Sequence, residues 1–450
     1  MTHGLDQLTP TKLVAFCHMR HFGRCQSAPF PKQGLGRSGQ CRGSYLGDQI
    51  PVISSGTAIA ICRAMSRLVL VLLPSAIAGW LAAQILWGAS LPAWSSLSVA
   101  ASATCPGESR SSQEPSLEPW TDTSVMPVDQ DWVWPGEFES PAYLLVGWDF
   151  DLEAYLLDII VASYRHVRVV VVMPWDERRD YIQERLREMG VCPDDVELVH
   201  TSLSSSWIRD FGPMMVRGLD GQHAIIDTRY AGDDDEDRVP SEVARELWPH
   251  LPLISLDLPL DGGNLLADGT GLCVTTFGHE LAFGSVDESM ASAENANDID
   301  LMKALVRQYL GCHEVVVVPP LWGEPTEHAD MFMSFTAPRE AIVGEYIGET
   351  DLFNGLLLDE VAETLQRHGV LVRRIPMPDN DDGRFRSYVN ALAVGDVVLV
   401  PVYPERPEHE TRALAGFRAA YPDRRIVPIV ASDVIGLQGA VHCTTMSIIP

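Results

Sequence analysis

Short apolar runs alternate with longer amphipathic segments from about residue 143 to the end of the 450-residue chain. Runs of Val, Ile and Leu are typical of buried strands, and apolar positions that recur every three or four residues are typical of helices. We expect strands over residues 143–147, 167–173, 224–227, 272–276, 314–318, 330–336, 341–345, 391–394, 397–402 and 425–430. We expect helices over residues 152–163, 176–189, 241–248, 299–310, 352–367 and 410–420. Gly190, Gly311 and Gly369 follow three of these helices as C-terminal stops. About five rounds of strand, strand and helix indicate one α/β domain of repeated units rather than a single long sheet.

The first part of the chain lacks this pattern. Residues 1–62 are rich in Gly, Arg, Ser and Cys and have no sustained periodicity. We therefore expect residues 1–64 to be disordered, or to lie upstream of the true start if translation begins at Met65. Residues 105–138 are rich in Ser, Pro and Glu, which predicts a linker. The folded domain is then predicted over residues 139–450.

An apolar segment separates these two regions. No charged residue occurs between Arg67 and Glu108, and the apolar run over residues 68–87 is long enough to cross a bilayer. Basic residues precede the run and Ala101-Ser102-Ala103 follows it, as in a secretory signal peptide with its cleavage site. Residues 65–104 are therefore predicted to be a signal peptide or a membrane anchor, and a buried helix is less favoured because the segment has no charged face. The protein is expected to be exported (periplasmic, extracellular or membrane-anchored) if this leader is real, and cytoplasmic otherwise.

The charge of the chain is very uneven. Residues 1–104 carry eight basic and two acidic residues, a net charge of +6, whereas the remainder carries 25 basic and 59 acidic residues, a net charge of −34. So acidic a body repels phosphate backbones and argues against a nucleic-acid partner. It suits a cationic substrate or cationic proteins, and it equally suits a protein that simply needs to be soluble.

Two polar clusters lie in the first half of the predicted domain. Trp207 and Asp210 belong to the sequence Trp-Ile-Arg-Asp-Phe-Gly-Pro, and the Gly-Pro turn places Asp210 at the end of a predicted strand. A turn aspartate that binds its own backbone is the alternative. Asp261 and Asn264 flank two glycines in Asp-Gly-Gly-Asn, which by itself predicts a hairpin turn.

Two further clusters lie in the second half. In Glu-His-Ala-Asp, an extended backbone would place His328 and Asp330 on the same side, because strand side chains alternate. An imidazole and a carboxylate on one face suit proton transfer or metal binding, but a metal normally takes three protein ligands and no third has a clear spacing. Asn390 closes the sequence Tyr-Val-Asn before an apolar strand, where a cap or ladder residue is the alternative.

Cys443 lies near the end of the chain, after Gly439 and directly after His442. A thiol beside an imidazole and a glycine-containing turn is typical of a nucleophile, although a buried inert cysteine is the commoner outcome for such a residue. Carboxylates near a thiol raise its pKa and oppose its ionisation. Their presence makes sense if the substrate is a cation that neutralises them, and a guanidinium fits because its forked N–H groups match carboxylates.

The order of these motifs, W-x-R-D-x-G-P, D-G-G-N, H-x-D, Y-V-N and G-x-x-H-C-T-T, resembles the bacterial, Porphyromonas-type peptidylarginine deiminase / agmatine deiminase family. This family is part of the guanidino-group-modifying, or pentein, superfamily. The resemblance covers about residues 130–450. It implies a five-bladed pseudo-symmetric α/β propeller of repeated ββαβ-like units, with residues 139–450 as the deiminase domain.

The resemblance also implies roles for the site residues. Cys443 would be the nucleophile, His328 the general acid and base, and Asp210 and Asp330 the carboxylates that hold the guanidinium. The substrate-binding residues would include Trp207 against the substrate stem, together with Asn390, Asp261 and Asn264. Neither a metal nor an organic cofactor is required by this chemistry.

The resemblance leaves the substrate open. The family acts on agmatine, giving N-carbamoylputrescine and ammonia, or on arginine in peptides, giving citrulline. The predicted leader favours a peptidyl substrate, whereas Asp261 and the acidic run at residues 230–238 favour agmatine. An acidic run is also typical of a solvated surface, and a calcium site there lacks a confirming spacing.

Two other classes of function remain as alternatives. One is a catalytically silent pentein that acts as a binding protein, and the other is an amidinotransferase that passes the amidino group to an amine. The remaining cysteines of the domain, Cys192, Cys273 and Cys312, are interpreted as core or spare thiols. Export would permit a disulfide, but the sequence assigns no pair.

Overall fold

The computed structural model describes residues 132–276, 293–348 and 351–450. The predictions for residues 1–64 and for the leader at 65–104 lie outside these residues, as does most of the predicted linker. Within the described part of the chain, no helix combines the length and the apolar character that a membrane span requires.

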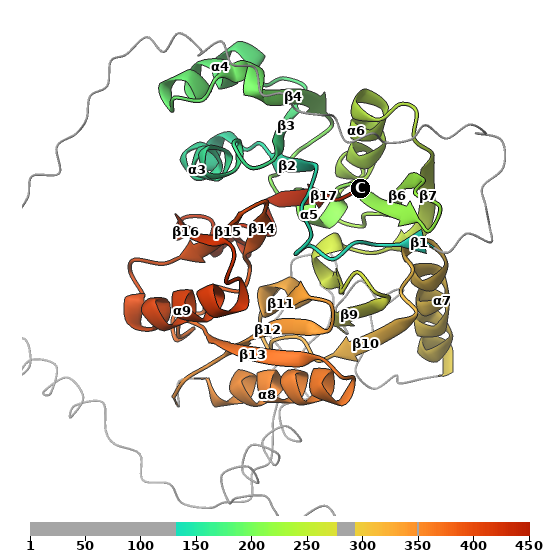
Figure 1. Cartoon of the computed structure of the whole chain (residues 1–450), viewed down its shortest axis with the longest axis vertical. Helices are drawn as coiled ribbons and strands as arrows, with labels where there is room; N and C mark the ends of the chain where they lie inside the picture. The colour runs from blue at the N-terminus through green and yellow to red at the C-terminus, as the bar shows by residue number, and fades with distance from the viewer. Residues whose placement is uncertain (1–131, 277–292, 349–350) are drawn as a thin grey trace, which may run out of the picture. The chain divides into compact units, whose positions relative to one another are not determined.

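The described residues form five sheets of three or four strands, and helices pack against them (Figure 1). The strands are β1 Trp132–Val133, β2 Tyr143–Gly147, β3 Arg168–Pro174, β4 Val196–Thr201, β5 Met214–Gly218, β6 His223–Arg229, β7 Leu253–Pro259, β8 Leu265–Ala267, β9 Leu272–Thr276, β10 Glu314–Val318, β11 Met333–Ala337, β12 Glu340–Glu345, β13 Leu371–Pro376, β14 Leu392–Val394, β15 Val397–Val402, β16 Arg425–Val430 and β17 Thr445–Ile448. The α-helices are α3 Glu153–Ser163, α4 Arg179–Glu188, α5 Ile208–Phe211, α6 Val239–Leu247, α7 Ala293–Leu310, α8 Leu352–Arg367 and α9 Glu410–Ala420. Short 3-10 turns that bear on the site are η4 Gly262–Asn264, η6 Ala329–Met331 and η8 Ile435–Leu437.

Each sheet is built from the same unit. An antiparallel strand pair is followed by a helix and by a strand parallel to the second member of the pair, as in β11, β12, α8 and β13. The units β5-β6-α6-β7, β8-β9-α7-β10 and β14-β15-α9-β16 repeat this order. The remaining sheet joins the two ends of the fold, because β17 pairs antiparallel with β2, which pairs in parallel with β3. The prediction of repeated α/β units is therefore confirmed.

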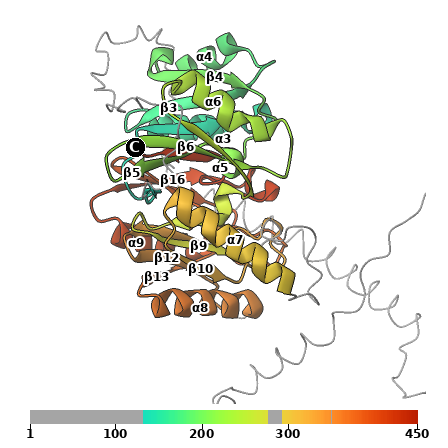
Figure 2. The same cartoon turned by 90° about the vertical axis from the view of Figure 1, so that its right-hand side faces the viewer.

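Helices lie between consecutive sheets. Helix α9 contacts both β13 and β16, which belong to neighbouring units, and α3 contacts β15 and β16 as well as leading into β3. Two views at right angles show α8 on the outer side of its sheet (Figures 1 and 2). The inner strands are almost fully buried, which explains their unbroken Val, Ile and Leu sequences.

Several predicted elements need correction. The strand predicted over residues 330–336 begins only at Met333, because the preceding residues form the 3-10 turn η6. His328 and Asp330 are therefore not related by strand alternation. Asp210 lies in the short helix α5 rather than at a strand end.

The boundary predicted at residue 139 is also too late. Strand β1 pairs antiparallel with β5, and Trp132 and Trp134 are buried in the core beside it. Residues 132–138 are therefore part of the fold rather than of a linker. The Ser, Pro and Glu content of the longer range 105–138 hid the two buried tryptophans that hold this segment in place.

Two cysteines predicted to be core or spare thiols are paired. Cys273 in β9 forms a disulfide with Cys312, which precedes β10, and both residues are buried. Because β9 and β10 run parallel, the disulfide links the two strands near their N-terminal ends. The interpretation as unpaired thiols is wrong for these two residues.

Candidate active site

Cys443 lies in a tight loop between η8 and β17, and the side chain of Asn390 holds this loop in place. The Oδ1 atom of Asn390 accepts hydrogen bonds from the backbone N–H groups of Ala440 and His442, at 3.0 and 3.1 Å. Its Nδ2 atom donates to Cys443 Sγ at 3.1 Å and to the carbonyl of Asp330 at 3.3 Å. Asn390 is fully buried, so its side chain supports the loop from behind.

Gly439 allows the ring of Trp207 to approach the thiol. A Cβ atom at this position would lie 2.4 Å from the Trp207 ring and 3.0 Å from Cys443 Sγ. A side chain therefore does not fit here. The preceding residue, Gln438, has a φ of 77°, so the chain turns through the left-handed region as it enters the loop. The structure thus brings Trp207 and Cys443 together, as expected of a ring that packs beside the reacting atoms.

Cys443 is the free cysteine of the described residues, and only 3% of its surface is exposed. Its thiol lies 3.4 Å from Asp330 Oδ2 and donates to it. Burial, together with the charges of Asp330 and Asp210, raises the pKa of the Cys443 thiol well above its ordinary value. The thiol is therefore protonated in the free protein at neutral pH.

His328 lies between two carboxylates. Its Nδ1 atom is 3.5 Å from Asp210 Oδ1, and its Nε2 atom is 3.5 Å from Asp261 Oδ2. Glu327 has a φ of 57°, and this strained residue turns the chain so that His328 can precede η6. The imidazole is buried, with 4% of its side chain exposed.

The carboxylates and the imidazole meet at the backbone of Gly263. A Cβ atom on Gly263 would lie 2.6 Å from Asp210 Oδ1, 2.9 Å from His328 Nδ1 and 3.1 Å from Asp330 Oδ2. The N–H of Gly263 donates to Asp210 at 3.2 Å. The absence of a side chain at this position therefore lets the backbone pack closely against three polar groups, two of which are carboxylates that suit a planar cation.

Asp330 uses only one of its two oxygens within the described protein. Oδ2 accepts from His442 Nδ1 at 2.7 Å and from the Cys443 thiol, whereas the buried Oδ1 has no hydrogen-bond partner among the described residues. Burial alone would raise the pKa of Asp330, but the hydrogen bond and charge of His442, with His328 and Arg209, hold it below its usual value. An ionised oxygen is thus left for a ligand.

Sequence reasoning gave no place in the site to Glu137 and Arg209, which lie behind Asp330, and considered His442 only as a neighbour of the thiol. His442 lies between Asp330 and Glu137, and Arg209 Nη1 is 2.5 Å from Glu137 Oε1. His442 and Arg209 stand inside the quoted motifs, next to the predicted Cys443 and Asp210. Glu137 was hidden in the predicted linker, where no pattern distinguished it.

Asn264 supports the site in the same way as Asn390. It is fully buried, and its Oδ1 atom accepts from Thr276 Oγ1 at 2.9 Å and from the N–H of Ala329 at 3.2 Å. These bonds join the end of β9 to η6 and so fix the loop that carries His328. Both asparagines therefore lie behind the site and hold its loops, Asn390 the cysteine loop and Asn264 the loop that carries His328.

The acidic run at residues 230–238 is a structured loop. Asp237 accepts from the N–H of Tyr230 at 2.6 Å, Asp233 accepts from the N–H of Asp235 at 2.7 Å, and Asp235 pairs with Arg238 at 2.5 Å. These carboxylates organise their own turn. No group of His, Cys, Asp or Glu within the described ranges is arranged to hold a metal ion.

A cavity of about 80 Å³ adjoins the two loops that carry Cys443 and His328. It is lined by Glu324, Pro325, Gly383, Arg384, Phe385, Ile435, Gly436 and Gln438. Glu324 is bonded to Thr326, which in turn accepts from the N–H of His328, and Gln438 immediately precedes Gly439.

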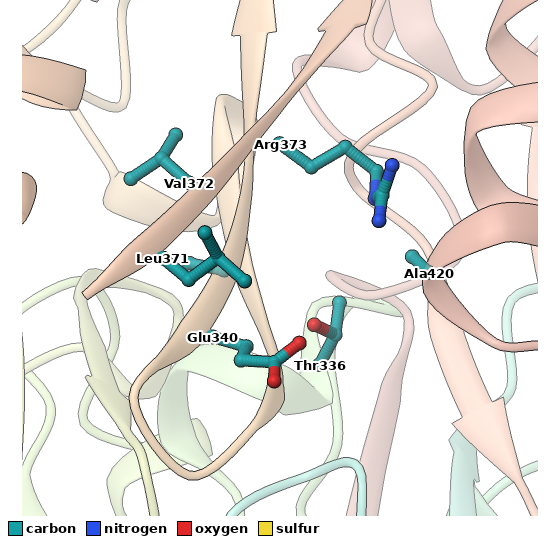
Figure 3. A pocket seen from close by; sticks show the side chains of 7 residues that line it. Thr336, Glu340, Leu371, Val372, Arg373 and Ala420 are labelled. Carbon is teal, nitrogen blue, oxygen red and sulfur yellow. The ribbon is translucent and has the colours of Figure 1, made fainter.

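A larger cavity, of about 180 Å³, lies away from this site. Thr336, Glu340, Leu371, Val372 and Arg373 line it beside Ala420 at the end of α9, as Figure 3 shows. None of these side chains contacts the cysteine loop, so this cavity plays no part in the site.

Comparison with known proteins gives a consistent result. The family model of Porphyromonas-type peptidyl-arginine deiminase matches residues 134–448. The "putative agmatine deiminase" of Latilactobacillus sakei is 23% identical over 296 residues, which span 57% of this chain and 78% of that protein. Its namesake from Enterococcus faecalis is 26% identical over 297 residues, or 56% of this chain and 77% of that protein.

Solved structures share the fold. The agmatine deiminase of Enterococcus faecalis has a TM-score of 0.60 at 20% identity and aligns with 73% of this chain and 98% of its own. The "putative arginine deiminase" from Porphyromonas gingivalis has a TM-score of 0.59 at 22% identity, with 70% of this chain and 98% of its own covered. The mixed α/β fold is therefore that of its pentein neighbours. Since the family model spans well over half of the sequence, the chain belongs to the Porphyromonas-type peptidyl-arginine deiminase family.

Proposed function

We propose that the protein hydrolyses a guanidino group to a ureido group and ammonia. The convergence of Cys443, His328, Asp210 and Asp330 on the space at Gly263 carries this proposal. A guanidinium bound beside these residues would donate to the carboxylates of Asp210 and Asp330, with its carbon facing the thiol. The membership of the chain in a deiminase family supports the same conclusion.

Substrate binding would activate the nucleophile. The carboxylates that raise the pKa of Cys443 are the groups that a bound cation neutralises, so the cation favours the thiolate. The Cys443 thiol would give its proton to His328, and the thiolate would attack the guanidinium carbon. His328 would then pass that proton to the nitrogen that leaves as ammonia. A covalent thiouronium remains on Cys443.

Water completes the reaction. His328, now neutral, takes a proton from water as it adds to the thiouronium carbon. The carbon–sulfur bond breaks, and His328 returns its proton to the sulfur. The remaining hydroxyl proton is lost to solvent as the carbonyl of the ureido product forms, and the product leaves with the second amino group still attached. Asp261, 3.5 Å from His328 Nε2, would orient the imidazole during both proton transfers.

We further propose that the five sheets are the blades of a pseudo-symmetric five-bladed α/β propeller. The repeated ββαβ unit, the helices between consecutive sheets and the pairing of β17 with β2 support this arrangement. It would explain why the site residues come from loops of several units, since such loops meet at one end of a propeller.

Observations on the substrate point in two directions. The relatives are named agmatine deiminases and the family model names peptidyl-arginine. Asp261 suits a cationic substrate without a carboxylate, whereas Arg384, exposed in the cavity of about 80 Å³, suits a substrate that carries one. Ammonia release from agmatine, free arginine, an internal peptidyl-arginine and a C-terminal peptidyl-arginine, measured side by side, separates these substrates.

Export of the protein is a further part of this proposal. The Cys273–Cys312 disulfide supports it, because disulfides persist mainly in oxidising compartments. Fractionation of cells that make the full chain, with and without residues 1–104, tests it. Retention of both forms in the cytoplasm would refute export, and recovery of the full chain with membranes would indicate an anchor through residues 68–87.

The decisive experiment on function is ammonia release by the full chain and by a Cys443→Ser variant. We expect the substitution to lower turnover by about 10³-fold or more, because the serine hydroxyl is a far weaker nucleophile without a dedicated base. A folded wild-type protein that is silent on all four guanidines would favour a binding pentein. Transfer of the amidino group to an added amine, without ammonia, would identify an amidinotransferase.

A further inference from the structure

Three buried ionisable side chains and the half-buried Glu137 form a continuous chain of ion pairs behind the thiol. Arg209 Nη1 pairs with Glu137 Oε1 at 2.5 Å, Glu137 Oε2 contacts His442 Nε2, and His442 Nδ1 lies 2.7 Å from Asp330 Oδ2. Arg209, His442 and Asp330 are 1%, 3% and 2% exposed. Arg209 Nε also donates to the backbone carbonyl of His442 at 3.3 Å, so Arg209 is bound directly to the cysteine loop.

The charges of these four side chains balance only if the His442 imidazole carries a proton on both ring nitrogens. Both of its ring nitrogens face a carboxylate, and an ionised carboxylate accepts hydrogen bonds but donates none. A neutral imidazole would leave one carboxylate facing a lone pair in a buried site, which is costly. With His442 protonated, two cations and two anions alternate along the chain.

The protonated state agrees with the electrostatics of each group. Burial and Arg209 alone would lower the pKa of His442, but Glu137 and Asp330 outweigh them and raise it. Burial would raise the pKa of Glu137, yet Arg209 and His442 lower it to about 2.

We infer that Glu137 and His442 are positioning residues for the proposed deimination: Glu137 holds His442 as an imidazolium, and His442 fixes the orientation of the Asp330 carboxylate, whose Oδ2 also contacts Cys443 and faces Gly263. This inference rests on the proposed function. It explains why Asp330 Oδ2 is occupied while the buried Oδ1 has no partner among the described residues. It also explains how a carboxylate stays ionised beside a buried thiol before substrate binds.

Removal of the Glu137 charge should therefore weaken the binding of the substrate guanidinium by Asp330. In Glu137→Gln the imidazolium loses one of its two anionic partners, so His442 becomes neutral at lower pH and stabilises the Asp330 carboxylate less. We expect kcat/KM to fall about 10- to 100-fold, mostly through KM. We also expect the acid limb of its pH profile to move upward by about one unit or more, because Asp330 would be protonated at higher pH.

Glu139→Gln is the matched control. Glu139 lies two residues further along and pairs with Arg217 at 2.9 Å, without contact to the site. Its amide variant still accepts from the N–H of Gly136, so the loop keeps that bond. The control should retain the wild-type acid limb. An unchanged acid limb in a folded Glu137→Gln variant would overturn the inference.

A measurement on the wild-type protein separates this inference from the proposed function. Nitrogen NMR of the full chain reports the protonation of both ring nitrogens of His442. Their signals are assigned by their absence from the spectrum of a His442→Gln variant. We expect His442 to be doubly protonated at pH 7, above the ordinary histidine pKa of about 6.5. A neutral His442 at pH 7 would refute the inference even if the enzyme is active, whereas an inactive protein with an imidazolium His442 would refute only the function.

Discussion

The residues that carry the chemistry could be identified from the sequence only where they belong to short motifs. Cys443, His328, Asp210, Asp261 and Asp330 stand in such motifs, and the structure brings them together. The second layer could not be found in this way, because its members act through contacts across the fold. Glu137 and His442 are 305 positions apart in sequence, and nothing in either local pattern predicts their contact.

Gly263 gives a prediction at the scale of a single methyl group. In Gly263→Ala the new Cβ would lie 2.6 Å from Asp210 Oδ1 and 2.9 Å from His328 Nδ1, so these groups must move and the space for the cation shrinks. We expect ammonia release to fall by about 100-fold, as for a reacting group displaced by about 1 Å. Gly355→Ala is the control, because no atom lies within 4 Å of its Cβ, and full activity in Gly263→Ala would exclude a substrate at this position.

At the scale of elements, strands that contain a run of Val, Ile or Leu were predictable, both inside a sheet and at its edge. The predicted bounds of β2, β9, β10, β15 and β16 match the observed ones, although β10 and β16 are edge strands with many exposed or half-buried side chains. Strand β13 was missed because its first four side chains alternate between exposed and half-buried, and two of them are arginines. Helices α8 and α9 were predicted correctly because their apolar period persists for several turns.

Asp227 gives a prediction for the pair β6 and β7. It faces Ser255 across the parallel ladder, and Ser255 Oγ donates to it at 3.1 Å. Burial, despite this bond and with help from Asp237, raises the pKa of Asp227 to about 6. The unfolded chain loses this proton near pH 4, so the folded state is penalised as pH rises from about 4 to about 6.

Asp227→Asn should remove this penalty while keeping an acceptor for Ser255. We expect the variant to gain up to about 3 kcal/mol over the wild type above pH 6, and to gain little at pH 4. Urea unfolding of both proteins at pH 4, 5, 6 and 7.5 tests this. A stability difference that stays constant across the series would show that the carboxyl is not perturbed in the fold.

At the scale of the whole molecule, closure of the fold and placement of the nucleophile depend on one strand. Strand β17 begins two residues after Cys443 and pairs with β2, so the cysteine loop is stretched between Asn390 and the sheet that contains β2. The sequence predicted β2 but neither β17 nor the pairing of the two strands, because four residues with a central serine resemble a loop as much as a strand. Long-range pairing of this kind leaves no local pattern.

Deletion of residues 445–450 should therefore remove more than a C-terminal tail. Met446 and Ile448 are 1% and 0% exposed, and the burial of each side chain stabilises the fold by about 1.5–3 kcal/mol. With the lost strand pairing, the deficit approaches the total stability of a typical domain, about 5–15 kcal/mol. We expect the truncated chain to lose cooperative unfolding and the protection of its thiol, which circular dichroism and reaction of Cys443 with a thiol reagent would report.

Deletion of Pro450 alone is the control. It removes a long hydrogen bond from Arg217, at 3.4 Å, and should preserve both cooperative unfolding and the protection of Cys443. A truncated protein that still unfolds cooperatively, with Cys443 still unreactive, would show that the cysteine loop is fixed by Asn390 without closure through β17.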